Sequence, residues 1–127
     1  MSGSVVIVVP GRPVSQPRPR VTRRGVYHKK NYTDYLAVVS DAAQEVFAEM
    51  HQRGEGWNAH AQHYAVRLRF WMPDRKNTDI DKLAATQLDG LTMAGAWADD
   101  RLVDKMRCER FVCKDDPRVE IEVEVMT

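Results

Sequence analysis

The alternation of apolar and polar residues along the chain predicts six secondary-structure elements. Residues 5–9 are apolar and β-branched and end at Pro10-Gly11, which indicates a buried first strand closed by a turn. Apolar residues within 33–50 recur with the one-sided period of 3.6 that is typical of an amphipathic helix. Residues 64–72 show the period of two of a strand with one buried face, and Pro73 ends that strand.

The second half of the chain predicts one further helix and two further strands. Apolar residues line one face of a helix from about residue 81 to 93, and Gly95 lies just past its end. A strand around residues 103–113 is followed by a turn at 114–117 and by a strand at 119–125, and we expect these two strands to form a hairpin. The order β-α-β-α-β-β predicts an α+β fold, with two helices packed on one face of a mixed four-stranded sheet.

Length and composition favour a single domain spanning residues 1–127. Of these 127 residues, 43% are hydrophobic, which is enough for one compact core. No run approaches the roughly 20 apolar residues of a membrane span, so we expect a cytoplasmic protein without a membrane segment. Cys108 and Cys113 lie five residues apart in a predicted strand and should point to opposite faces, so we expect free thiols.

Positive charge is concentrated near the amino terminus. Residues 1–60 carry 8 basic and 5 acidic side chains, whereas residues 61–127 carry 11 and 13. Before the first acidic residue, Asp34, the basic residues are Arg12, Arg18, Arg20, Arg23, Arg24, Lys29 and Lys30. They are spread through a segment at about 10–31 that we name the arm, whose four prolines exclude a helix. We expect an extended, partly mobile loop that contacts the phosphates of a polyanion, and a solvated tail without a partner is the alternative.

Aspartates gather in the second half of the chain. The ones we consider as ligands lie within 31 residues and are Asp74, Asp79, Asp81, Asp99, Asp100 and Asp104. Their oxygens are the ligands that Mg²⁺ prefers. A helix over 81–93 rises about 18 Å and seven extended residues span up to about 23 Å, so the chain is long enough to return Asp100 to the helix start. Aspartates also cap helices and occupy turns, so the pattern alone leaves metal binding and capping both open.

Three segments with fixed spacing resemble the RusA family of Holliday-junction resolvases. They are Met72-Pro73-Asp74-Arg75 leading to Thr78-Asp79-Ile80-Asp81-Lys82-Leu83, then Leu88-Asp89-Gly90-Leu91, then Gly95-Ala96-Trp97-Ala98-Asp99-Asp100. The family pattern is a proline–aspartate turn, D-x-D-N-L, a helix with L-D-x-L, and a glycine followed by a D-D pair. The arm adds a second match, since residues 9–13 and 16–22 with Tyr27 look like the start of phage-type members.

This resemblance implies a homodimeric endonuclease that depends on Mg²⁺, with Mn²⁺ as a substitute, and that resolves four-way DNA junctions by paired symmetric nicks. Carried over position by position, it implies that Asp79, Asp81 and Asp100 bind the metal. It further implies branched DNA as the partner, a role in DNA recombination and repair, and a bacterial host cell with a phage or prophage origin.

The chain departs from the family pattern at two positions. The asparagine after D-x-D is Lys82 here, and Ala85 replaces a lysine that the family uses in catalysis. Lys82 precedes Ala85 by one helical turn and lies on roughly the same face, so we hypothesise that it supplies the missing catalytic ammonium group. A solvated surface lysine is the alternative.

Two other functions stay open from the sequence. The same acidic residues suit a nuclease that cuts other branched DNA, such as flaps and forks. The missing lysine at Ala85 also suits a protein that binds branched DNA without cleaving it.

Overall fold

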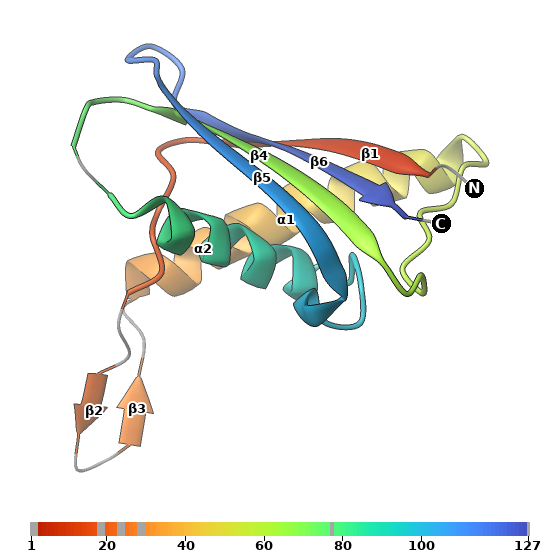
Figure 1. Cartoon of the computed structure of the whole chain (residues 1–127), viewed down its shortest axis with the longest axis horizontal. Coiled ribbons are helices and arrows are strands. Elements are labelled where there is room, and N and C mark those ends of the chain that lie inside the picture. The colour runs from red at the N-terminus through yellow and green to blue at the C-terminus, as the bar shows by residue number, and fades with distance from the viewer. Residues whose placement is uncertain (1–2, 18–19, 23–24, 28–29, 77, 127) are drawn as a thin grey trace.

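The computed structural model describes residues 3–17, 20–22, 25–27, 30–76 and 78–126. Its elements lie close to the predicted ones and confirm the α+β fold (Figure 1). In chain order they are β1 (Ser4–Pro10), β2 (Arg20–Thr22), β3 (Gly25–Tyr27), α1 (Lys30–Gln52), β4 (Tyr64–Met72), α2 (Ile80–Met93), the 3-10 turn η1 (Asp100–Leu102), β5 (Val103–Val112) and β6 (Arg118–Val125).

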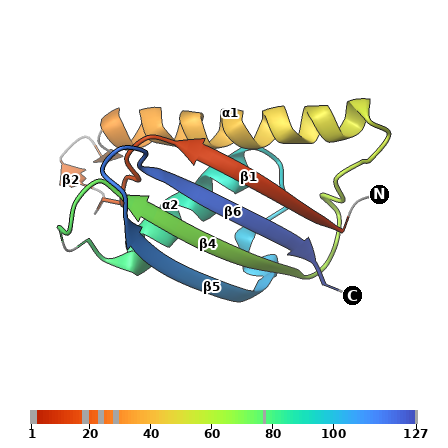
Figure 2. The ribbon, with the colours of Figure 1, turned by 90° about the horizontal axis from the view of Figure 1, so that it is seen from above.

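The four long strands form one mixed sheet in the order β1-β6-β4-β5 (Figure 2). β6 pairs antiparallel with both β1 and β4, whereas β5 pairs parallel with β4. The predicted hairpin between the last two strands is therefore wrong. β6 buries every second residue in its first six, so it belongs inside the sheet, whereas β5 is mostly exposed and takes an edge. The parallel pair is possible because α2 supplies the crossover between β4 and β5.

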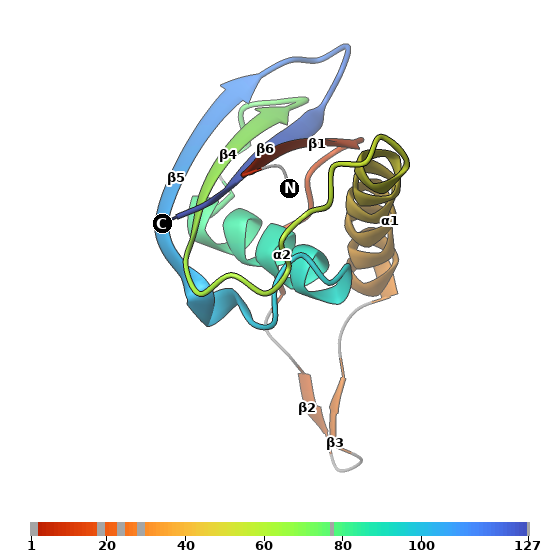
Figure 3. The same cartoon turned by 90° about the vertical axis from the view of Figure 1, so that its right-hand side faces the viewer.

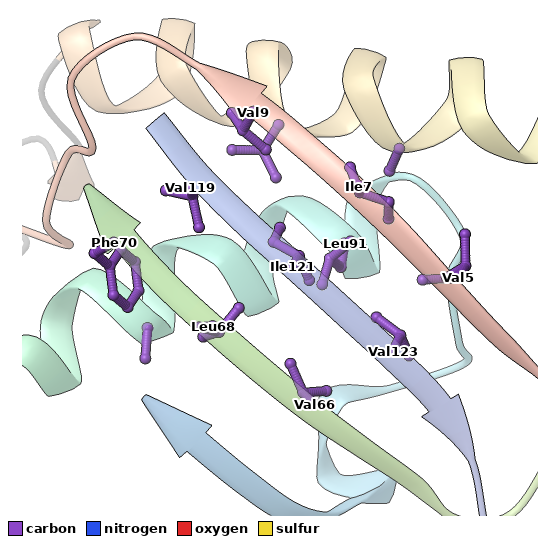
Figure 4. Close-up of a cluster of buried hydrophobic side chains, with 14 of the residues drawn as sticks. Val5, Ile7, Val9, Val66, Leu68, Phe70, Leu91, Val119, Ile121 and Val123 are labelled. Carbon is purple, nitrogen blue, oxygen red and sulfur yellow. The ribbon is translucent and has the colours of Figure 1, made fainter. Parts of the chain in front are cut away.

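Both helices cover the same face of the sheet (Figure 3). Alternate residues of β1, β6 and β4 point into the core between the layers (Figure 4): Val5, Ile7, Val9, Val66, Leu68, Phe70, Val119, Ile121 and Val123. Gly90 allows α2 to approach α1 closely, because a Cβ atom there would lie 2.4 Å from Cγ1 of Val39. This packing fixes α2 against the sheet and thereby positions its acidic residues.

The arm contains structure that the sequence did not predict. β2 and β3 form a short antiparallel hairpin that lies apart from the four-stranded sheet (Figure 1). The expectation of a wholly irregular loop is therefore wrong for residues 20–22 and 25–27. Prolines exclude a helix from this segment but leave β-pairing possible where they are absent.

The remaining expectations concern the cysteines and the helices. Cys108 and Cys113 are free and partly buried, as predicted. Gly95 has a φ of +81° just beyond α2, which agrees with its predicted place at the helix end. None of the helices among the described residues has the length and apolarity that a membrane span requires.

Candidate active site

The amino end of α2 presents two exposed carboxylates. Asp79 is the N-cap residue and Asp81 lies in the first turn. The side chain of Asp79 makes no capping hydrogen bond, and its Oδ2 lies 3.8 Å from Nζ of Lys82. Capping therefore does not explain Asp79, and this carboxylate stays accessible from solvent, with 69% of its side chain exposed.

Arg110 on β5 supports the same end of the helix. Its guanidinium donates to the backbone carbonyl of Thr78, the residue directly before Asp79. This contact ties the start of α2 to the edge strand of the sheet. It also brings a cation close to the chain segment that carries Asp79 and Asp81.

A second pair of carboxylates consists of Asp89, on the third turn of α2, and Asp100. Asp100 begins η1, and its pKa is raised by burial, by Asp99 and by Asp89. Asp99 itself is a turn residue whose Oδ1 accepts a hydrogen bond from the backbone N–H of Arg101 at 3.0 Å. The two members of the D-D pair thus differ, because Asp99 caps a turn and its pKa is lowered, whereas the partly buried Asp100 has a raised pKa.

Asp89 is the best-anchored acid of this group, and the sequence analysis assigned it no role. Its Oδ2 accepts hydrogen bonds from Oη of Tyr32 at 2.6 Å and from Nε2 of Gln16 at 2.9 Å. Burial and the bond to Asp89 raise the pKa of Tyr32 to about 12. Asp89 therefore joins the arm, α1 and α2 next to Asp100, and its place in the L-D-x-L segment was the signal available in the sequence.

The three predicted metal ligands are distributed along α2 and η1. Asp89 lies eight residues, or about 12 Å of helix rise, beyond Asp81, and after burial and Asp99 it is Asp89 whose charge raises the pKa of Asp100. Within the described residues, no three side chains of His, Cys, Asp or Glu stand close enough together to hold a metal ion. The structure thus places Asp79 and Asp81 at the helix start and Asp100 beside Asp89.

The arm begins against this site. The backbone N–H of Gln16 donates to the carbonyl of Lys82 at 3.1 Å, and Arg12 pairs with Asp74 at 3.0 Å. Of the other predicted DNA-binding residues, Arg20 begins β2 and Lys30 begins α1. Arg18, Arg23, Arg24 and Lys29 lie outside the described residues.

Comparison with known proteins identifies the family. The family model described as endodeoxyribonuclease RusA matches residues 10–124. The chain belongs to the RusA family. The resemblance seen in the sequence is thereby confirmed, and the match includes both the arm and all the acidic segments.

Individual relatives match part of the chain. A crossover junction endodeoxyribonuclease of Enterobacteria phage 82 is 34% identical over 61 residues, which are 48% of this chain and 51% of that protein. The proteins of the same name from Escherichia coli K12 and Shigella sonnei show the same identity over the same length and coverage. The alignment thus spans about half the length of these curated RusA relatives.

Proposed function

We propose that this protein is a metal-dependent endodeoxyribonuclease that resolves four-way DNA junctions by paired symmetric nicks. The observation that carries the proposal is the exposed pair Asp79 and Asp81 at the start of α2, with Lys82, Arg110 and the root of the basic arm beside it. The RusA relatives, named crossover junction endodeoxyribonucleases, supply the substrate class.

The donor set suits Mg²⁺, with Mn²⁺ as a substitute. Asp79, Asp81 and Asp100 offer carboxylate oxygens, which hard divalent cations prefer. In the described structure the three do not stand close together, so Asp100 would have to move toward the helix start to share an ion with Asp79 and Asp81. The raised pKa of Asp100 reflects burial and negative neighbours, and a nearby cation would offset that repulsion. When bound, the metal supplies charge stabilisation of the phosphate and activation of water.

The chain's own residues prepare the site around that metal. Asp89 is held by its bonds from Tyr32 and Gln16, and its charge contributes to the raised pKa of Asp100. Lys82 lies beside Asp79, where its ammonium group can meet a phosphate oxygen of the DNA, in place of the lysine missing at Ala85. At the start of α2 this places the Asp79 carboxylate and the Lys82 cation side by side.

The basic residues of the arm hold the DNA. We propose that Arg12, Arg18, Arg20, Arg23, Arg24, Lys29 and Lys30 contact phosphates, which positions DNA without reading its sequence. Two symmetric nicks require two acidic sites, so the proposal includes a homodimer.

Comparing cleavage of branched DNA under Mg²⁺ and under Ca²⁺ tests the proposal. A mobile four-way junction and a flap duplex, each labelled on every strand, are incubated with the full chain. We expect symmetric nicks in the junction with Mg²⁺, and binding without nicking with Ca²⁺.

Other outcomes of this assay would identify the alternatives. Preferential cleavage of the flap would favour a flap or fork nuclease. Binding under both ions with nicking under neither would favour a protein that binds without cleaving, which the alanine at position 85 makes a specific alternative.

A further inference from the structure

A pocket of about 510 Å³ lies outside the carboxylate site, where β4 and β5 end. Its walls include Trp71 and Phe111 from the two strands, Asp74, Arg75 and Lys76 from the segment that follows β4, and Arg110 from β5. We call this the Phe111 pocket. Its volume lies within the range of small-molecule binding sites.

An aromatic stack forms one wall of the pocket and ends at the sheet edge. The guanidinium of Arg118 lies 4.6 Å from the ring centroid of Trp71, and the Trp71 and Phe111 rings stack at 4.4 Å with 23° between their planes. These residues come from β6, β4 and β5, which are consecutive in the sheet. In the described part of the chain no strand pairs with the outer side of β5, so the stack can be extended beyond Phe111.

The charges around the pocket are predominantly positive. Among the described residues that line it, Asp74 is the one acidic residue, and this carboxylate already accepts hydrogen bonds from the backbone N–H of Lys76 and from Arg12. Among residues 3–17, 20–22, 25–27, 30–76 and 78–126, Arg75, Lys76 and Arg110 form no salt bridge with an acidic side chain, although the charge of Lys76 helps to lower the pKa of Asp74. A ligand with a flat aromatic ring and an adjacent negative charge would complement this surface.

We propose that the Phe111 pocket binds one unpaired nucleotide of the DNA substrate, with its base stacked on Phe111 and its phosphate near Arg75, Lys76 and Arg110. The inference rests on the proposed DNA substrate. A base within a duplex is covered on both faces by its neighbours, so only an unstacked base can extend the aromatic stack. Branch points are where such bases occur.

The position of the pocket gives the bound nucleotide a role in placing the cut. Arg110 lines the pocket and also donates to the carbonyl of Thr78, directly before Asp79. A nucleotide held there is therefore linked through one side chain to the start of α2. The pocket would fix the register between the branch point and the phosphate that reaches Asp79 and Asp81.

Binding of two matched DNA probes to the full chain tests this inference without cleavage. Both probes are duplexes with one bulged nucleotide, which is 2-aminopurine in the first and an abasic residue in the second, in Ca²⁺ buffer. Stacking predicts quenching of the 2-aminopurine and at least about five-fold tighter binding of the first probe. Phe111→Ala should bring that affinity ratio close to one, whereas Phe111→Trp should keep it.

Met106→Ala is the matched control, because Met106 is another exposed apolar residue of β5 outside the pocket. Its affinity ratio should equal that of the unaltered protein. Equal binding of the two probes by the unaltered protein would refute the inference, whatever the folding of the variants. So would a ratio that Phe111→Ala leaves unchanged. This test is independent of the cleavage assay. The affinity ratio of the two probes can persist in a protein that does not nick junctions, and a protein that nicks junctions can bind both probes equally.

Discussion

The start of α2 and its third turn carry acidic residues in opposite environments. At the start, Asp79 and Asp81 are exposed, and the one ion pair of Asp79 is a 3.8 Å contact to Lys82 in the described structure. At the third turn, Asp89 accepts two short hydrogen bonds and acts on the partly buried Asp100. The first region is open to a ligand, whereas the second is held in place by the fold.

In our proposal the acidic residues of this family motif therefore serve two different purposes, ligand binding at the start of α2 and stabilisation of the fold at its third turn. Exposed carboxylates keep their binding capacity available, but they contribute little to stability because solvent competes for them. A carboxylate bonded to Tyr32 and Gln16 helps to hold the arm and α1 to α2, and it has less freedom to coordinate anything else. Substitutions at the two ends of α2 should therefore change different measured quantities.

The largest effect is expected for Asp81→Asn, which removes a proposed metal ligand. We expect junction cleavage in Mg²⁺ to fall by at least about 100-fold, since even residues behind the ligands of a metal site are worth 10–100-fold. The free energy of unfolding should change by less than about 0.5 kcal/mol, because Asp81 is exposed. Single-turnover cleavage and thermal unfolding measure the two quantities. Asp41→Asn, an exposed aspartate on α1, is the control and should leave both unchanged.

Asp89→Asn should affect the free energy of unfolding more than the rate of junction cleavage. Replacing this carboxylate weakens its bonds from Tyr32 and Gln16, and we expect a loss of about 2 kcal/mol in the free energy of unfolding. Urea denaturation measures this loss. Tyr32→Phe removes one of the two bonds and should cost about 1 kcal/mol. Unchanged stability in both variants would contradict the anchoring role of Asp89.

Lys82→Ala should slow junction cleavage by about tenfold. Loss of a buried hydrogen-bond donor at an active site costs roughly 100-fold, and we expect less here because the Lys82 side chain is 41% exposed. Single-turnover rates at saturating protein measure the chemical step. The double variant Lys82→Ala with Ala85→Lys restores the family lysine and should recover the rate. If Lys82→Ala cleaves as fast as the unaltered protein, Lys82 is a solvated surface residue.

The local elements were predictable from the sequence because their signals are local. The period of apolar residues located both helices and all four long strands to within a few residues. Strand pairing was not predictable in the same way, because it depends on which faces are buried after α2 has crossed over. The weakly apolar β5 takes the edge and β6 inserts between β1 and β4, which no short-range pattern encodes.

The candidate site was predictable in its residue types and less so in its arrangement. Spacing showed that Asp100 was able to return to α2, but not which turn of the helix it would meet. The partners of Asp89 are 73 and 57 residues away in sequence, so no local pattern indicates them. The Phe111 pocket was likewise not predictable from the sequence, because the rings of Trp71 and Phe111 meet only through the parallel pairing of β4 and β5.

The smallest effect is expected for the arm, whose root contacts both regions through the backbone of Gln16 at Lys82 and its side chain at Asp89. Arg18→Ala combined with Arg20→Ala should weaken junction binding a few-fold. It should also reduce the slope of log affinity against log salt by about two, roughly one for each lost phosphate contact. Titrations in Ca²⁺ from low to high salt measure that slope, with Arg53→Ala, directly beyond the carboxyl end of α1, as a control that should not alter it. An unchanged slope would show that the arm does not hold phosphates. Because both substitutions leave Asp81 and Asp89 unchanged in the sequence, the cleavage rate at saturating protein and the free energy of unfolding should both stay constant.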